Sequence, residues 1–154
     1  MISELYNEKI LDFAANIPRL GRLARPDGTA SVRSRLCGSS VVVDVDVADG
    51  KVADFAHDVK ACALGQASSS IMARHVLGAS LEELREVRDT MRAMLKENGD
   101  PPAGKWAELA YLQPVKDHRA RHASTMLTFE ATVAAFENAL AAEAGGTADL
   151  AAAR

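Results

Sequence analysis

The apolar positions follow a helical period at the N-terminal end of the chain. Four apolar or aromatic side chains lie at helical spacing there: Leu5, Tyr6, Ile10 and Phe13. Ser3 can cap this helix, and Pro18 and Gly21 can end it, because proline does not continue a helix and glycine favours a turn. We therefore predict a first helix that ends before Pro18.

The period changes to that of a strand after residues 26–28, a Pro-Asp-Gly turn. Residues 32–36 alternate between uncharged side chains and arginine, and residues 41–47 form a run rich in β-branched valine. The hairpin signal Asp49-Gly50 joins this run to a third strand over residues 51–59. Three successive strands joined by short turns predict an antiparallel meander, with one face left for helices.

Helical spacing returns in the rest of the chain. We expect a helix over residues 61–77 that Gly78 ends, and then a helix that opens with a Ser80–Glu83 capping box. The apolar stripe of this second helix consists of Leu84, Val87, Met91 and Met94. Residues 98–102, Asn-Gly-Asp-Pro-Pro, end it.

Two further helices are predicted beyond this break. The first is short and covers residues 106–112, and the second is long and begins with Asp117 as its cap. One face of the long helix carries His122, Met126, Phe129, Val133, Phe136 and Leu140. From residue 141 the chain is rich in alanine and contains two successive glycines, so we expect a single domain over residues 1–140 and a flexible tail over residues 141–154.

The predicted fold is therefore α+β, a three-stranded antiparallel meander sheet with helices packed on one face. A net charge of −3 argues against a nucleic-acid partner, and no apolar run approaches the roughly 20 residues of a membrane span. The N-terminus lacks the features of a secretory signal, so we expect a cytoplasmic protein without a membrane partner. No exposed apolar stripe indicates a dimer, so we expect a monomer.

The two cysteines of the chain are the first candidates for chemistry. Cys37 precedes Gly38 at the hinge between the first two strands, and Cys62 opens the helix after the third strand. A meander brings both positions to the same end of the sheet, and the free N–H groups of a helix N-terminus stabilise a thiolate. Two neighbouring thiolates can form a soft-metal or sulfur site, although two buried structural cysteines are the simpler reading of these residues alone.

His118 and His122 are the second candidates, because a spacing of four places both on one face of the predicted last helix. The alternative is that His122 packs on the core stripe and His118 lies at a solvated helix start. Asp44 and Asp46 share the opposite face of their strand from the valines and are expected to face water. No Gly-rich phosphate loop, GxSxG elbow or HExxH motif is present, so the chain is not expected to be such an enzyme.

The order of these motifs resembles the U-type iron–sulfur cluster assembly scaffolds, the family of IscU, SufU and the NifU N-terminal domain. The resemblance covers about residues 4 to 140 and implies a SufE/NifU-like fold. The family's Cys-Gly-Asp motif corresponds to Cys37-Gly38-Ser39. An acidic position of the family's third strand corresponds to Asp54. The family's second cysteine and the Ala-Ser-x-Ser helix that follows it correspond to Cys62 to Ser70. Residues 16–21 are similar to the family's Asn-Pro-Arg-Asn-x-Gly stretch, and residues 113–116 resemble the Pro-Pro-Val-Lys segment that IscU proteins show to their chaperone.

The chain departs from the family at two of the four expected site residues. Ser39 replaces the aspartate. An IscU-like register puts Arg119 at the third cysteine, whereas a SufU-like register, which is longer and ungapped, puts Ser124 there. We prefer the second register, and in either case no thiol stands at this position.

The loss of these residues changes the metal ligands that the resemblance implies. A serine hydroxyl is a poor ligand near neutral pH, so His122, two residues before Ser124, is the expected third ligand beside Cys37 and Cys62. His118, a serine or water would complete the set. Such a set suits Zn²⁺ or a labile iron–sulfur cluster.

The resemblance implies a scaffold or carrier that is not an enzyme in its own right. It would receive sulfur from a cysteine desulfurase, hold a nascent cluster at Cys37 and Cys62, and pass it to cluster-accepting proteins. Two alternatives stay open. One is a SufU-like zinc-dependent sulfur acceptor for the desulfurase, and the other is a degenerate paralogue that keeps the fold and binds a partner without metal.

Overall fold

The computed structural model describes residues 6–36 and 38–144, and it has the predicted α+β architecture. The elements are, in chain order, α2 (Glu8–Ala15), β1 (Gly28–Arg33), β2 (Ser40–Ala48), β3 (Lys51–Lys60), α3 (Ala63–His75), α4 (Leu81–Lys96), the 3₁₀ segments η1 (Gly104–Asp117) and η2 (Arg119–Arg121), and α5 (His122–Ala144). The strands form one antiparallel sheet in the order β1-β2-β3. The predicted meander is therefore confirmed.

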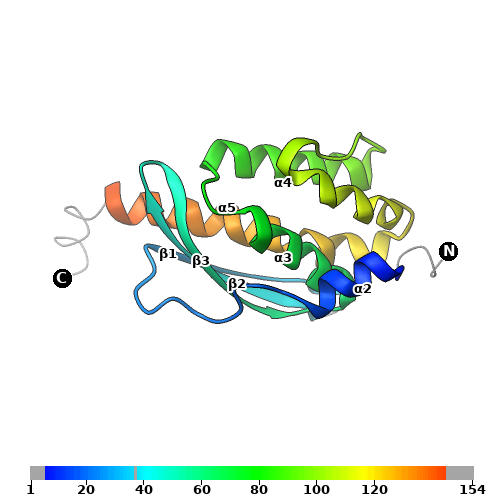
Figure 1. The fold of residues 1–154 in the computed structure, drawn as a ribbon, viewed down its shortest axis with the longest axis horizontal. Coiled ribbons are helices and arrows are strands. Elements are labelled where there is room, and N and C mark those ends of the chain that lie inside the picture. Colours follow the sequence, from blue (N-terminus) through cyan, green and yellow to red (C-terminus); the bar gives the residue numbers. More distant parts are fainter. Residues whose placement is uncertain (1–5, 37, 145–154) are drawn as a thin grey trace.

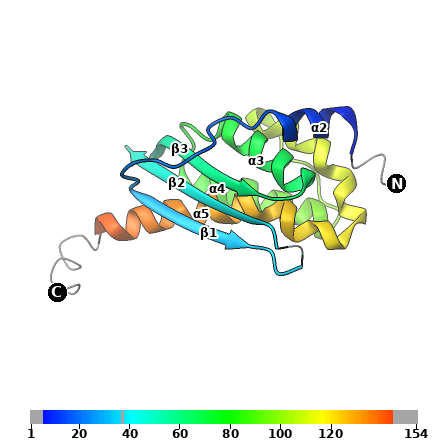
Figure 2. The ribbon, with the colours of Figure 1, turned by 90° about the horizontal axis from the view of Figure 1, so that it is seen from below.

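The helices form two layers above one face of the sheet (Figure 1). Helix α5 packs on β1 and β2, α3 packs on β3 and α5, and α4 lies beyond them against α5. Seen from below, the strands lie in front of these helices, as Figure 2 shows. The buried face of the sheet carries Val41, Val43, Val45 and Phe55, as the alternation of β2 predicts.

Side-chain caps set the starts of α2 and α4. The Asn7 carboxamide oxygen accepts the backbone N–H of Ile10 (3.0 Å) and caps α2, while the predicted cap Ser3 lies outside the described residues. The Ser80 hydroxyl accepts the N–H of Glu83 (3.1 Å) at the start of α4, which confirms the Ser80 half of the predicted capping box. Helix α4 then buries the whole apolar stripe that the sequence predicts, and α2 buries Ile10 and Phe13 of its predicted stripe.

The first strand lies earlier in the chain than predicted. It covers Gly28–Arg33, whereas the alternation of residues 32–36 suggested a later strand. The reason is a loop closed by two backbone hydrogen bonds, from Ser34 N–H to the Ser39 carbonyl (2.8 Å) and from Gly38 N–H to the Ser34 carbonyl (3.0 Å). Gly38 adopts a φ of 71°, so the tight turn predicted at this glycine is confirmed.

The start of the last helix was predicted wrongly. Asp117 is the final residue of η1, and α5 begins only at His122. The chain leaves the helical conformation between them, since His118 has φ −127° and ψ 79°. Helix α5 continues to Ala144, past the predicted boundary at residue 140, and residues 145–154 lie outside the described part of the chain.

Asp44 was also predicted wrongly, because it is completely buried rather than exposed to water. Part of the segment between α2 and β1 lies over Asp44 on the face of the sheet opposite the helices. Asp44 accepts hydrogen bonds there from Arg22 Nε (2.7 Å), the Thr29 hydroxyl (2.7 Å) and the Leu23 N–H (3.0 Å). Burial alone raises the pKa of Asp44, but these hydrogen bonds outweigh it and hold the pKa below its ordinary value.

Candidate functional site

The candidate site lies at the end of the sheet where the β1–β2 loop meets the start of α3. Ser40, the first residue of β2, pairs with both Arg33 of β1 and Lys60, the last residue of β3. Cys62 follows Lys60 by two positions, so the loop after β1 and the entry to α3 share one end of the sheet, as the meander predicts. Cys37 belongs to that loop in sequence but lies outside the described residues, so its role as a ligand stays a prediction.

Cys62 occupies the N-cap of α3. Its backbone is extended (φ −67°, ψ 172°), its thiol makes no capping hydrogen bond, and the residue is partly exposed. Its sulfur is a free thiol. A partly exposed thiol beside the positive end of a helix of 13 residues is suited to nucleophilic or metal-binding chemistry.

The Cys62 thiol has a polar partner in Ser124. The Cys62 sulfur and the Ser124 hydroxyl oxygen lie 3.3 Å apart, and the hydroxyl also donates to the Arg121 carbonyl (3.2 Å). Ser124 is 1% exposed, so its hydroxyl has a fixed place in the first turn of α5. The contact is what the SufU-like register predicts for the position of the third cysteine.

Gly65 allows the two helix starts to come this close. A Cβ at this position would lie 3.0 Å from the Ser124 carbonyl oxygen and 2.7 Å from the Ala61 Cβ. Both separations are shorter than an ordinary van der Waals contact, so the close approach of α3 to α5 depends on the missing side chain. The glycine therefore sets the distance between Cys62 and Ser124.

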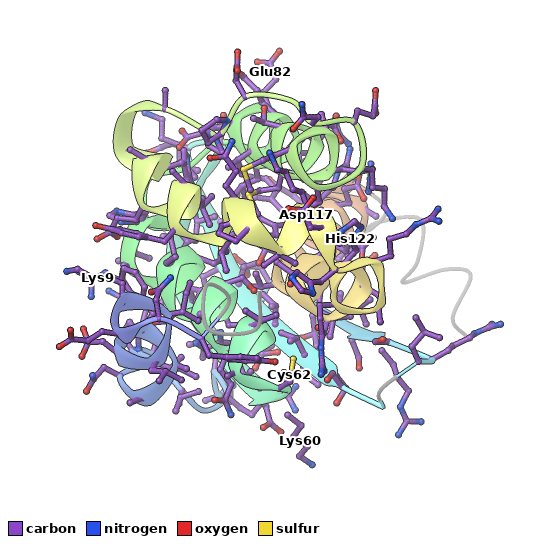
Figure 3. All side chains as sticks on the ribbon, turned by 90° about the vertical axis from the view of Figure 1, so that its right-hand side faces the viewer. Lys9, Lys60, Cys62, Glu82, Asp117 and His122 are labelled. Carbon is purple, nitrogen blue, oxygen red and sulfur yellow. The ribbon has the colours of Figure 1, made fainter. Side chains whose placement is uncertain are left out.

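His122, the predicted third ligand, faces backbone carbonyls. Its Nε2 lies 3.0 Å from the Val115 carbonyl oxygen and 3.1 Å from that of Lys116, and the residue is 5% exposed. Since both partners can only accept, Nε2 carries the proton. Figure 3 shows His122 and Cys62 in separate places on this side of the molecule. A ligand role for His122 requires its ring to leave these carbonyls, and it stays a prediction.

His118 does not share a helix face with His122, so that prediction was wrong. His118 lies in the bend between η1 and η2, four residues before α5 begins at His122. In residues 6–36 and 38–144, no three His, Cys, Asp or Glu side chains gather closely enough to hold a metal ion. In the described part of the site, the soft donor that a metal could use is the Cys62 sulfur, with the Ser124 hydroxyl beside it.

The segment that resembles the family's Asn-Pro-Arg stretch lies along β3. Leu20 forms a parallel bridge to His57, with hydrogen bonds from Gly21 N–H to the His57 carbonyl (2.9 Å) and from His57 N–H to the Arg19 carbonyl (3.2 Å). Arg19 is 3.7 Å from Asp54, the acidic residue of β3. Asp54 pairs with Asp46 across the sheet, near the turn between β2 and β3, so this ion pair lies away from Cys62.

Comparison with known proteins identifies the family. A family model for the NifU-like N terminal domain matches residues 5–138, nearly the whole chain. The chain belongs to this family. The resemblance drawn from the motif order is thereby confirmed.

Relatives and solved structures agree with this membership. The Thermotoga maritima iron–sulfur cluster assembly scaffold protein IscU is 28% identical over 118 residues, which cover 76% of this chain and 82% of that protein. The N-terminal NifU-like protein of Brucella abortus has a crystal structure that matches with a TM-score of 0.88 and 55% identity, over 90% of this chain and 96% of that one. The SUF-system protein FiSufU of Fervidobacterium islandicum matches with a TM-score of 0.80 at 19% identity, over 87% and 98%, and supports the fold alone.

None of the helices in the described residues, including α5 with its 23 residues, is long and apolar enough to cross a membrane.

Proposed function

We propose that this protein is a scaffold or carrier in iron–sulfur cluster assembly, with the cluster as its cargo. The observation that supports the proposal is the free, partly exposed Cys62 thiol at the sheet end that also carries the Cys37 loop, in a chain of the NifU-like N-terminal family. Several relatives carry the name of scaffold or assembly protein. Iron and sulfide would be held by Cys37 and Cys62 and then passed to an acceptor protein.

The proposed ligand set favours transfer over storage. Two thiolates are half of the four cysteines that usually hold a cluster, and a serine hydroxyl adds little near neutral pH. We propose His122 as a third ligand once its ring leaves the carbonyls of Val115 and Lys116, with the fourth position left to water or to a partner. A weakly held cluster can be released to acceptors, as the task of a carrier requires.

A second candidate is a SufU-like, zinc-dependent sulfur acceptor, which the contact of Cys62 with Ser124 favours because it follows the SufU-like register. The Cys62 thiolate would attack the outer sulfur of a persulfide on a cysteine desulfurase. A new S–S bond forms on Cys62, and the cysteine of the desulfurase leaves as a thiolate. The Ser124 hydroxyl, which donates its proton to the Arg121 carbonyl, can accept the S–H of Cys62 and so hold the thiol in place before the attack.

The remaining features of the proposal follow from the same site. The chain acts on cargo that its partners supply, so we propose no catalytic residue and no enzymatic turnover of its own. A free thiol with this task needs a reducing compartment, so we propose a cytoplasmic protein. A metal-free interaction module of the same fold remains the alternative if both metal experiments below are negative.

Anaerobic reconstitution with iron and sulfide tests the scaffold function. We expect visible charge-transfer absorption in the wild-type protein, together with bound iron and sulfide, and its loss in Cys37→Ser and in Cys62→Ser. Ser31→Ala, at an exposed position of β1, is the control and should keep the spectrum. A colourless wild-type protein would contradict the proposal, and about one zinc per chain in the protein as purified, lost in Cys62→Ser, would favour the zinc-dependent acceptor instead.

A further inference from the structure

A basic hollow of about 310 Å³ lies where the end of α4, the end of η1 and the start of α5 meet. The residues that line it are Leu95, Lys96, Lys116, Arg119 and His122. Three of these five are cations, they come from three different segments, and no carboxylate is among them. The hollow is therefore a concentrated patch of positive charge on a chain whose net charge is −3.

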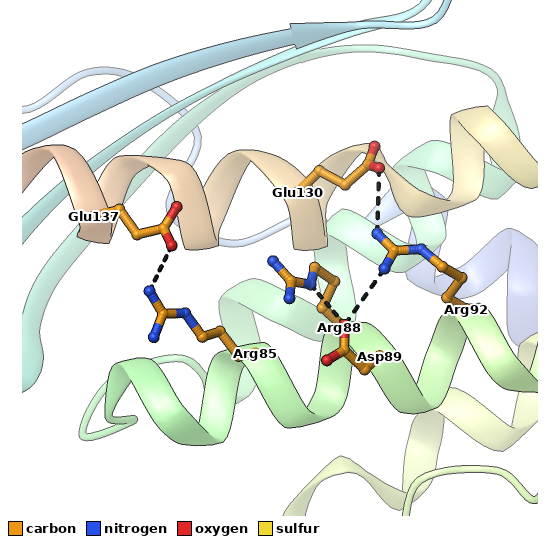
Figure 4. Close-up of polar contacts among 6 residues, drawn as sticks. All are labelled: Arg85, Arg88, Asp89, Arg92, Glu130 and Glu137. Carbon is orange, nitrogen blue, oxygen red and sulfur yellow. Dashed lines mark hydrogen bonds and ion pairs between the residues drawn. The ribbon is translucent and has the colours of Figure 1, made fainter.

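The cations of the hollow differ from other cations of the same helices in having no charged partner. On the neighbouring face of α4 and α5, Arg85 pairs with Glu137 (2.6 Å), and Arg92 pairs with both Asp89 (3.4 Å) and Glu130 (3.7 Å), as Figure 4 shows. In the described part of the chain, by contrast, Lys96, Lys116 and Arg119 form no ion pair. Lys116 donates to a neutral acceptor, the Asn98 side-chain oxygen (2.9 Å).

Helix dipoles explain only part of this arrangement. Lys96 and Lys116 lie in the last turns of α4 and η1, where a cation is favourable. Arg119 precedes the start of α5, where the dipole of a 23-residue helix makes a cation unfavourable. Three like charges around one hollow also repel one another unless an anion lies between them.

We propose that this hollow binds a small oxyanion of the phosphate class. The two lysines supply mobile ammonium donors, and the planar guanidinium of Arg119 supplies a fork that matches two oxygens of a tetrahedral anion. The hydrogen bonds of His122 to the carbonyls of Val115 and Lys116 hold the end of η1 against the start of α5, on two sides of the hollow. The bound anion would contact the first turn of α5, which also carries Ser124, and so would stabilise the helix start beside Cys62.

Calorimetric titration of the full chain with inorganic phosphate at low ionic strength tests this site. We expect saturable binding to one site, weakened about tenfold in Lys116→Gln and in Arg119→Gln, since each removes a charge-assisted hydrogen bond. Lys51→Gln is the matched control, because it removes one positive charge at an exposed position of β3 and should leave the affinity unchanged. A parallel titration with adenosine triphosphate distinguishes free phosphate from a phosphate ester as the source of the anion, and binding of either that is lost in the same variants supports the proposal.

Three results would overturn the site: no saturable binding of either probe, equal weakening in Lys51→Gln, or binding of a hexaglutamate peptide without binding of phosphate. Circular dichroism of each variant shows whether it is folded. If Lys116→Gln or Arg119→Gln does not fold, Lys96→Gln takes its place in the titration. The titration is repeated with the Cys37→Ser, Cys62→Ser double variant, which should bind phosphate like the wild type. The outcome is therefore independent of whether the chain binds a cluster.

Discussion

The Cys62 sulfur lies 3.3 Å from the hydroxyl oxygen of Ser124, although the two residues open different helices. Ser124 thus stands at the position where the SufU-like register places a third cysteine. A serine at that position is a weaker metal donor than a cysteine. Under the proposed function, weak retention of the cluster is the expected consequence.

Restoring a thiol at this position should strengthen cluster binding. In Ser124→Cys, we expect the reconstituted cluster to lose iron to a chelator roughly tenfold more slowly, the effect of about 1.4 kcal/mol of added binding free energy. The decay of visible absorbance after chelator addition measures this rate. Ala123→Cys, which adds a thiol one residue away on α5, is the control, and equal slowing in both variants would show that the position beside Cys62 has no special role.

Gly65 should be intolerant of a side chain. Gly65→Ala puts a Cβ against the Ser124 carbonyl and Ala61, so we expect a loss of about 1–3 kcal/mol in the free energy of unfolding from overpacking. Urea unfolding measures the change, with Gln66→Ala on the same helix as control. If Gly65→Ala has the same urea midpoint of unfolding as the wild type, α3 and α5 do not approach each other as closely as the structure shows.

His122 can be tested as a ligand separately from its structural role. His122→Ala should change the visible spectrum of the reconstituted protein and speed the loss of iron, whereas His118→Ala, in the bend before α5, should not. A purely structural His122 would give the variant a lower unfolding free energy, because the hydrogen bond to Val115 is lost, with an unchanged spectrum. That second result would remove His122 from the proposed ligand set.

Asp44 should make stability depend on pH in acid. Its pKa in the folded protein lies below the ordinary value, so the unfolded state binds more protons, and the stabilisation is present at neutral pH and lost from about pH 5 downward. Asp44→Asn should lower the unfolding free energy at neutral pH by about 1–3 kcal/mol, because Arg22 and Thr29 lose a charged acceptor. The difference from the wild type should shrink as the pH falls. Asp58→Asn, at an exposed position of β3, is the control and should leave the unfolding free energy at neutral pH nearly unchanged.

The sequence predicts those parts of the fold that local chemistry determines. The valine run of β2, the Asp49-Gly50 hairpin and the Ser80 cap each act within a few residues, and the structure has all three. The meander also follows from them, and with it the shared end of the sheet that carries the candidate site.

The errors concern contacts between distant segments. Asp44 alternates with valines as a solvent-facing residue does, and nothing local to β2 reveals that Arg22 will cross the sheet and bury it. The start of α5 depends on two successive 3₁₀ segments, whose conformation is set by packing rather than by the capping propensity of Asp117. The contact of Cys62 with Ser124 was accessible only through the family resemblance, because residue spacing alone does not pair a cysteine with a serine so far along the chain.

Counting free thiols before and after cluster loading tests the central claim most directly, because the chain has only two cysteines. The reconstituted protein is alkylated under native conditions, and the modified residues are identified by mass spectrometry. We predict that Cys37 and Cys62 are both protected while iron is bound and that both react after chelation. Iron bound with either thiol still reactive, or a protein that binds no iron, would contradict the account.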